Sequence, residues 1–165
     1  MPVAFITQKA IFPRNLAGVS RLIVELILMT NHRNRQVKTV LVNPGKGWSW
    51  RQQAGIVFLV LEALEQTGLV RHGFSTRKGG VSQAHYSRLN LGLHVGDDPR
   101  LVLENRCRFA SALGVAFRDL VIPAQVHSDQ VAVVGRAQAG FGASDLETAV
   151  PGVDALITQE PELPL

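Results

Sequence analysis

Four of the five histidines are the side chains best placed by type to bind a metal ion or transfer a proton: His72, His85, His94 and His127. No two of them are four residues apart, as two ligands on one face of a helix would be. A zinc centre takes three or four protein ligands, so spacing alone favours an ordinary surface or core role for each. The single cysteine, Cys107, cannot form an intrachain disulfide, which fits a reducing compartment.

The run HGFSTRKGGVS at residues 72–82 has the chemistry of an anion-binding turn. A predicted strand carries Ser75, Thr76 and Arg77 into the paired glycines Gly79 and Gly80. Glycines accept positive φ, and hydroxyls, an arginine fork and exposed backbone N–H groups together suit a phosphate. A plain hairpin turn with charged residues at its tip is the simpler explanation on residue chemistry alone.

The elements that must position these groups begin at residue 56. A continuous apolar, β-branched run at residues 56–61 predicts a buried strand. Further strands are expected at residues 69–75, 120–122, 130–134 and 155–158. With one well-signalled helix among them, they predict a mixed α/β (α+β) sheet domain in which one apolar face of a sheet lacks cover.

The helix begins at Asp98-Pro99, because Asp98 can cap the first turn and proline at the first helical position loses no hydrogen bond. Val102, Phe109 and Leu113 recur at helical spacing and predict its buried face. Gly114 is expected to end it.

Residues 1–47 differ from the rest in charge and pattern. Residues 1–61 hold eight Lys or Arg against one acid, Glu25, whereas residues 62–165 hold nine against twelve. The basic residues are scattered without interleaved aromatics, so nucleic-acid binding is not expected. The apolar run at residues 22–29 is too short to span a bilayer, and the sequence predicts a cytoplasmic protein. A helix at residues 15–29 and a strand at residues 40–42 are expected here.

Several linked runs, in this order, resemble the YfiH family, also called laccase-domain or multicopper polyphenol oxidoreductase proteins. The runs are HGFSTRKGGVS (72–82), LNLGLHVGDDP (89–99) with ENR (104–106) after it, QVHS (125–128) and AVPGVDALIT (149–158). The resemblance covers residues 48–165 and implies a YfiH-type α/β sandwich. It also implies a zinc-dependent purine nucleoside phosphorylase acting on adenosine, inosine or methylthioadenosine with phosphate, with adenosine deaminase activity.

The resemblance implies roles for particular residues as well. His127, in QVHS, corresponds to one ligand of the family's metal. A Cys in an ADC motif and a His in an HAGWRG motif supply the others, and neither motif occurs in this chain. The residues expected to bind substrate are Ser75, Arg77, Gly79 and Gly80 for phosphate, and Asn90 and His94 for the nucleoside.

Two departures from the family pattern bear on these roles. Ser128 stands where the family has Gly, and a need for positive φ there would strain the loop or shift His127. Cys107, within the predicted helix, is expected to be a small buried side chain and not a ligand.

Because the sequence ends before the other two metal motifs, we expect this chain to form only the first half of the domain. Whether this chain is itself an enzyme does not follow from the sequence. The alternatives are a copper-dependent polyphenol oxidase and a catalytically inert fragment. No catalytic residue or oligomeric state follows from the sequence.

Overall fold

The computed structural model describes residues 47–165, and the basic extension with its expected helix and strand lies outside this range. The described part opens with an antiparallel sheet of β1 (Trp48–Gln53), β2 (Ile56–Leu61) and β3 (Phe74–Ser75). Ala54 and Gly55 join β1 to β2 with φ values of 49° and 81°. Positive φ at both central residues is the tight hairpin geometry that follows strand twist. One short helix, α1 (Glu62–Glu65), follows β2.

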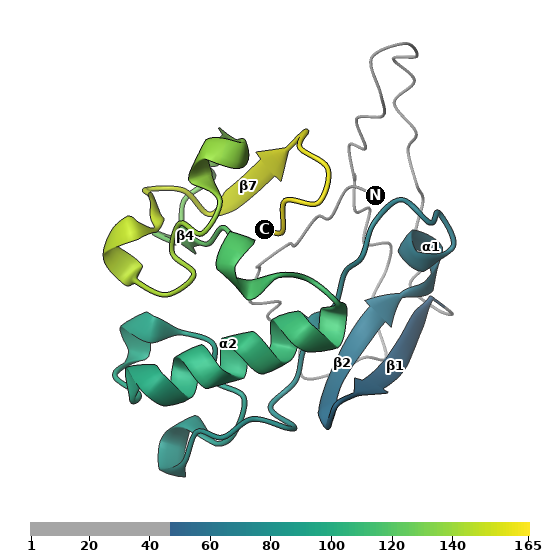
Figure 1. Cartoon of the computed structure of the whole chain (residues 1–165), viewed down its shortest axis with the longest axis vertical. Helices are drawn as coiled ribbons and strands as arrows, with labels where there is room; N and C mark the ends of the chain where they lie inside the picture. Colours follow the sequence, from purple (N-terminus) through teal and green to yellow (C-terminus); the bar gives the residue numbers. More distant parts are fainter. Residues whose placement is uncertain (1–46) are drawn as a thin grey trace.

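The long helix α2 (Pro99–Leu113) begins and ends where the sequence predicts. The Asp98 carboxylate accepts the Arg100 N–H at 2.9 Å, and Gly114 adopts a φ of 68° after the last turn. Figure 1 shows α2 crossing the molecule, with its C-terminal end beside β2. Helix and sheet are therefore packed by the residues that the helical periodicity selects.

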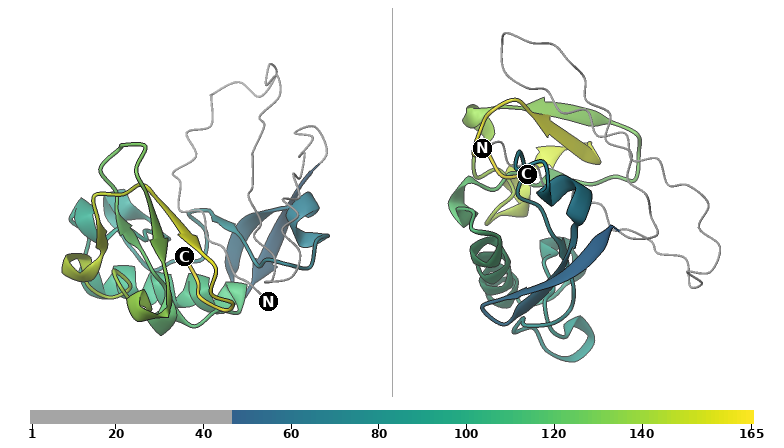
Figure 2. Two further views of the ribbon diagram at one scale, coloured as in Figure 1. Left: turned by 90° about the horizontal axis from the view of Figure 1, so that it is seen from above. Right: turned by 90° about the vertical axis from the view of Figure 1, so that its right-hand side faces the viewer.

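Two pairs of short parallel strands make up the remainder. β4 (Pro123–Ala124) pairs with β6 (Val150–Pro151), and β5 (Val131–Val134) pairs with β7 (Ala155–Thr158). Single turns of 3-10 helix occur in the connections. η2 (Ala84–Tyr86) and η3 (Leu93–Val95) precede α2, η4 (Phe117–Asp119) follows it, and η5 (Arg136–Gln138) and η6 (Leu146–Thr148) lie between β5 and β6. The antiparallel sheet and the parallel pairs lie on different sides of the molecule (Figure 2). The mixed α/β class is thus confirmed.

Each side has its own apolar cluster. Under the antiparallel sheet, Ile56, Phe58 and Val60 pack with Leu113, and the Phe58 and Phe109 rings meet edge to face at 6.3 Å. The second cluster unites Val121, Val134, Leu163 and Leu165. Burial of each such side chain contributes about 1.5–3 kcal/mol.

The outer face of the β5–β7 pair is apolar and exposed. Val131, Val133 and Ile157 have exposed fractions of 52%, 76% and 46%. They alternate with the inward-facing residues of the same strands, as strand geometry requires. The expected uncovered sheet face is therefore present among residues 47–165. No helix in this range is long and apolar enough to cross a membrane.

Two predicted strands are shorter or shifted. Only Phe74–Ser75 of residues 69–75 forms a strand. Side chains take the place of strand partners for two backbone N–H groups nearby: Thr67 Oγ1 accepts the Leu69 N–H, and His72 Nε2 accepts the Leu61 N–H. The strand expected at residues 120–122 is β4 at Pro123–Ala124. The Val121 and Ile122 N–H groups bond to Pro164 and Phe141, which belong to no strand, and only the Ile122 carbonyl bonds to β6, at the Val150 N–H, so the ladder begins at Pro123.

The expectation that Cys107 is buried is wrong, because its side chain is exposed. The inward face of α2 passes through Val102, Arg106 and Ala110, and Cys107 lies about 100° round the helix from Arg106. Partial desolvation and the nearby Glu104 carboxylate raise the pKa of the Cys107 thiol, which disfavours the reactive thiolate.

Residues Asn105 and Arg106 of the ENR run are buried and hold loops together. Asn105 accepts the Val81 N–H at 2.8 Å and donates to Ser82 Oγ and to the carbonyls of Arg88 and Asn90. Arg106 donates to the carbonyls of Leu91, Gly142 and Ala143, each at 2.7 Å. Burial lowers the pKa of Arg106 to about 10, so the guanidinium is still charged at neutral pH. These residues tie α2 to both halves of the fold.

His72 is expected to make the fold sensitive to acid. Burial lowers the pKa of its imidazole, and acceptance of the Leu61 N–H at 2.8 Å requires an unprotonated Nε2, although the Glu65 carboxylate opposes the shift. A folded-state pKa below 6.5 means that the unfolded chain binds the proton more readily. Stability is therefore complete above that value and falls as the pH drops below it.

We therefore expect the free energy of unfolding of the wild type to fall between about pH 7 and pH 5 more steeply than that of His72→Gln. Glutamine can accept the same N–H but does not titrate, and the other histidines are common to both proteins. Urea unfolding across this range measures the difference. Parallel curves would show that His72 takes no part in the acid response.

Candidate functional site

The anion-binding turn borders a surface hollow of about 560 Å³. Arg77, Lys78 and Gly79 line it from the turn, and Ser87 and Arg88 line it from a loop ten residues further on. Gln52, Gly55 and Val57 of the β1–β2 hairpin complete the wall. Three cationic side chains and no carboxylate thus surround one hollow.

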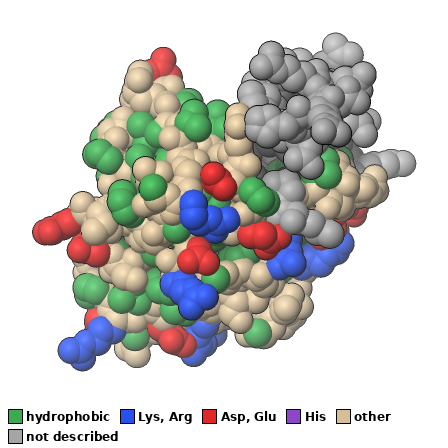
Figure 3. All heavy atoms as spheres, turned by 45° about the horizontal axis from the view of Figure 1, so that its top comes forward, with side chains coloured by type: hydrophobic (Ala, Val, Ile, Leu, Met, Phe, Trp, Pro, Cys, Tyr) green, Lys and Arg blue, Asp and Glu red, His purple; other side chains and the backbone are tan. Residues whose placement is uncertain are grey.

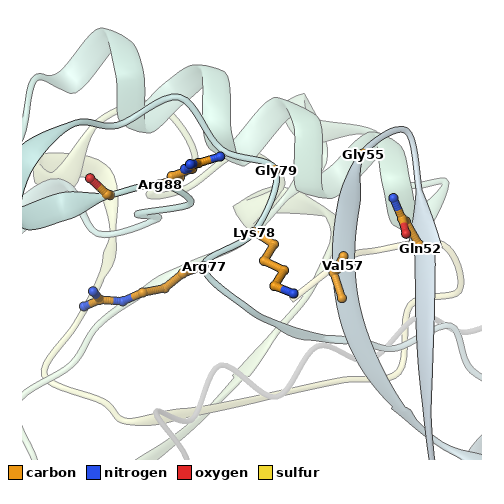
Figure 4. A pocket seen from close by; sticks show the side chains of 8 residues that line it. Gln52, Gly55, Val57, Arg77, Lys78, Gly79 and Arg88 are labelled. Atoms are coloured by element: carbon orange, nitrogen blue, oxygen red, sulfur yellow. The ribbon is translucent and has the colours of Figure 1, made fainter.

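The side chains of the three cationic residues point in different directions. Lys78 extends toward Val57, Arg88 lies beside Gly79, and Arg77 projects to the other side of the turn (Figure 4). No ion pair or side-chain hydrogen bond joins any of them to another residue in the range 47–165. Their positive charge is therefore available to an external anion.

The paired glycines are required by close backbone contact. A Cβ on Gly79 would overlap the Gly55 carbonyl, and one on Gly80 would overlap the Arg88 carbonyl. Gly79 also has a φ of 91°, which side chains rarely adopt. The two contacts hold the turn against the hairpin on one side and against the loop bearing Arg88 on the other. Close packing thus builds the hollow.

The other residues expected to bind phosphate or nucleoside lie elsewhere. Ser75 is exposed on β3 and does not line the hollow. Asn90 uses its amide N–H₂ on Asp97 at 2.9 Å and its oxygen on the Gly92 N–H. His94 is exposed on η3. Of the six residues, the structure brings only Arg77 and Gly79 to the hollow.

Asp97 explains the placement of Asn90. Its carboxylate accepts hydrogen bonds from Ser82 Oγ at 2.6 Å, from Asn90 and from the Asp98 N–H. These bonds, led by that of Ser82, lower the pKa of Asp97. Through Ser82 the network reaches the buried amide of Asn105. The Asn90 side chain therefore already has hydrogen-bond partners within residues 47–165.

His127 lies in the exposed loop between β4 and β5 with a φ of 61°. The positive φ considered for Ser128 is found one residue earlier, at His127. Asp154 holds both residues: Oδ1 accepts the His127 N–H at 2.8 Å, and Oδ2 accepts the Ser128 N–H at 2.7 Å and its hydroxyl at 2.8 Å. Bonds to Ser128 and His127 lower the pKa of the Asp154 carboxyl. Serine at this position gains a partner that glycine lacks.

The described residues do not assemble a metal centre by themselves. Within residues 47–165, no three His, Cys, Asp or Glu side chains gather closely enough to hold a metal ion. The His127 imidazole is exposed and makes no hydrogen bond within this range. A catalytic zinc site takes three protein ligands, so His127 alone does not satisfy it.

Three residues were missed at the sequence level: Lys78, Arg88 and Asp154. Lys78 is within the turn, so its chemistry was visible. Arg88 carries no local signal, because only the contact of Gly80 with its carbonyl brings it to the hollow. Asp154 follows Gly152 in a turn before a strand, and nothing in that context points to His127.

Charges elsewhere are mixed. On the face shown in Figure 3, basic and acidic side chains lie next to one another, with apolar side chains scattered between them. Exposed pairs such as Arg51 with Glu65 and Arg108 with Glu104, each at 2.7 Å, neutralise part of the surface. The hollow differs because no acidic side chain lines it.

The sequence profile of the multi-copper polyphenol oxidoreductase laccase family matches residues 71–165. The chain belongs to this family, which is the one that the HGFSTRKGGVS and QVHS runs resemble. Among solved structures, YlmD from Geobacillus stearothermophilus superimposes with a TM-score of 0.60 at 41% identity, over 67% of this chain and 40% of that one. A hypothetical protein YfiH from Bacillus licheniformis gives 0.60 at 30% identity, over 69% and 41%.

Curated relatives carry names of nucleoside enzymes. Purine nucleoside phosphorylase YlmD of G. stearothermophilus is 44% identical over 88 residues, which are 53% of this chain and 32% of the relative. A purine nucleoside phosphorylase of Deinococcus radiodurans is 52% identical over 51% of this chain and 32% of its own length. An adenosine deaminase, RL5, from an unknown prokaryotic organism is 44% identical over 52% and 33%. The chain therefore spans about a third of the relatives it matches.

Proposed function

We propose that this chain carries the phosphate-binding part of a purine nucleoside phosphorylase. In phosphorolysis, a phosphate oxygen bonds to C1′ of the ribose while the bond from C1′ to the purine nitrogen breaks. The products are ribose 1-phosphate and the free base. The observation that carries the proposal is the hollow lined by Arg77, Lys78 and Arg88 without a carboxylate. The names of the relatives support the same reaction.

The hollow suits a phosphate on physical grounds. A phosphate carries up to two negative charges at neutral pH and accepts several hydrogen bonds. Arginine forks match its oxygens in pairs, and lysine adds a mobile point charge. The Gly79 and Gly80 contacts fix the backbone that carries all three cations, so less ordering remains for the binding step.

The finer assignments belong to the same proposal. Purine nucleoside is the second substrate, with Asn90 and His94 at its pocket, and Ser75 and Gly80 near the phosphate. Zinc is the metal, for which His127 supplies one ligand. Residues 48–165 form part of a laccase-type domain in a cytoplasmic protein that binds neither nucleic acid nor membrane. Adenosine deamination acts on the same nucleosides, so nucleoside binding is common to both activities.

Phosphate titration of the ¹⁵N-labelled chain tests the proposal directly. We expect amide shifts concentrated at residues 76–80 and 87–89. Arg77→Ala and Arg88→Ala should each weaken phosphate binding by about tenfold or more, because a charge-assisted hydrogen bond contributes about 1.5–3 kcal/mol. Nuclear magnetic resonance titration gives the site and the dissociation constant in one experiment.

Arg118→Ala is the matched control, because the Arg118 side chain is 87% exposed and lies 3.9 Å from Asp119, away from the residues that line the hollow. It should leave phosphate affinity unchanged. Equal weakening by all three substitutions would show a diffuse response to net charge. Shifts spread outside the turn and the Arg88 loop would overturn the assignment of the hollow.

A further inference from the structure

We propose that Asp154 is a positioning residue, which holds the His127 imidazole in place by fixing the backbone beneath it. In giving His127 a part at the reaction site, the inference rests on the proposed function. The geometry itself depends only on residues 125–131 and 154–155. Nothing in the QVHS run shows the need for Asp154, which is distant in sequence.

The first support is the conformation of His127. Its φ of 61° lies in the left-handed region, where the Cβ of any residue other than glycine is crowded. Such a conformation persists only where neighbouring contacts impose it, and it is found disproportionately at functional positions. His127 is moreover exposed, so packing of its side chain does not impose the conformation.

The second support is the set of bonds that impose it. Asp154 Oδ1 accepts the His127 N–H at 2.8 Å, and Oδ2 accepts both the backbone N–H and the hydroxyl of Ser128, at 2.7 and 2.8 Å. One carboxylate thus binds two successive amides on the C-terminal side of Val126. Bonds to a charged acceptor are about twice as strong as neutral ones.

The third support is that Asp154 is itself held. Its N–H donates to the Gln130 carbonyl at 3.0 Å, and the next residue, Ala155, begins the ladder of β7 with Val131 of β5. The parallel pairing of β5 with β7 therefore sets the position of the carboxylate relative to the His127 loop. The imidazole, which makes no hydrogen bond among residues 47–165, is left free for a ligand.

The test compares Asp154→Ala and Asp154→Asn with Asp129→Asn in the full chain. Asp129 is also exposed and adjacent to the loop, but among residues 47–165 its carboxylate accepts only from the Gln130 side chain, at 3.0 Å. Backbone chemical shifts report φ at residue 127, and hydrogen exchange reports the His127 and Ser128 amides. We expect Asp154→Ala to move residue 127 out of the left-handed region and to lower the protection of both amides by about tenfold or more.

Asp154→Asn keeps an oxygen acceptor and should restore part of the protection, whereas Asp129→Asn should change nothing. A second comparison uses the His127→Gly background, in which positive φ carries no Cβ penalty. There, Asp154→Ala should leave the left-handed conformation of residue 127 in place. Loss of that conformation both with His127 and with His127→Gly would show that Asp154 only links the two loops, and it would overturn the positioning role.

Phosphate titration of Asp154→Ala separates this inference from the proposed function. Normal phosphate shifts at residues 76–80 with a displaced His127 support a local positioning role, and they do so whether or not the chain catalyses phosphorolysis. Loss of the phosphate shifts along with the His127 signature would show that Asp154 supports the whole fold, which contradicts the inference. An undisturbed His127 in Asp154→Ala would also contradict it.

Discussion

Replacing Asn105 by alanine is expected to lower the free energy of unfolding by about 3–5 kcal/mol, a large share of the stability of a small domain. The side chain is fully buried and joins four groups: the Val81 N–H, the Ser82 hydroxyl and the carbonyls of Arg88 and Asn90. Removing it takes the partner from the Val81 N–H and the Asn90 carbonyl and leaves a small cavity, whereas the Ser82 hydroxyl keeps Asp97 and the Arg88 carbonyl keeps the Ser82 N–H. Each buried orphan costs about 1–3 kcal/mol, and the cavity adds to this cost. Urea unfolding followed by circular dichroism measures the loss.

Two further variants fix the interpretation. Asn105→Asp retains an acceptor for the Val81 N–H but no donor for the carbonyls, and should still cost several kcal/mol. Ser111→Ala, on an exposed turn of the same helix, should change stability by less than about 0.5 kcal/mol. An Asn105→Ala protein within about 1 kcal/mol of the wild type would show that the loops are held by other contacts.

The second large effect is expected for Gly80→Ala, which should cost about 3 kcal/mol or more. The added Cβ would overlap the Arg88 carbonyl and crowd the Leu89 Cα, both backbone atoms that no rotamer change can move. The turn around Gly80 and the loop around Arg88 would move apart. Two hydrogen bonds between them would break, from the Ser82 N–H to the Arg88 carbonyl at 2.9 Å and from the Leu89 N–H to the Arg77 carbonyl at 3.2 Å. Arg88 would leave the hollow.

Gly135→Ala is the matched control, because Gly135, like Gly80, lies outside the left-handed region, with a φ of −127°, and the nearest neighbours to a new Cβ lie 3.9 Å away. It should leave stability nearly unchanged. Thermal unfolding and the phosphate titration are read on both variants, and we expect Gly80→Ala to lose phosphate affinity as well as stability. Normal phosphate binding in a destabilised Gly80→Ala protein would show that phosphate binding does not depend on the contact between Gly80 and Arg88.

Local signals in the sequence determined the elements that depend on a few neighbouring residues. The Asp98-Pro99 start and Gly114 end of α2 follow from capping and backbone freedom, and both are found where expected. The apolar run of β2 and the strand Ala155–Thr158 are likewise found. These features are local, because a helix cap or a strand period needs no distant partner.

The sequence failed where a distant residue decides the outcome. The Val121 and Ile122 N–H groups bond to Pro164 and Phe141, and only the Ile122 carbonyl reaches β6, at the Val150 N–H, so the paired strand begins one residue later. Cys107 is exposed because α2 turns Asn105 and Arg106 inward, where they bond to loop carbonyls, and Cys107 then lies outside the buried face. Periodicity predicts which apolar residues of a helix are buried. It does not predict that polar side chains beside them are buried as well, because these side chains bond to loop carbonyls that are distant in the sequence.

For the candidate site, the sequence by itself determined the family motifs, the chemistry of the Arg77 turn and the single imidazole at His127. Only the tertiary structure decided that Arg88 joins Arg77 and Lys78 around one hollow, that Asn90 bonds to Asp97, and that Asp154 holds the His127 loop. Each of these pairings joins residues separated by a turn, a strand or a helix. Their distance in space is set by backbone contacts such as Gly80 against Arg88, which residue types along the chain do not encode locally.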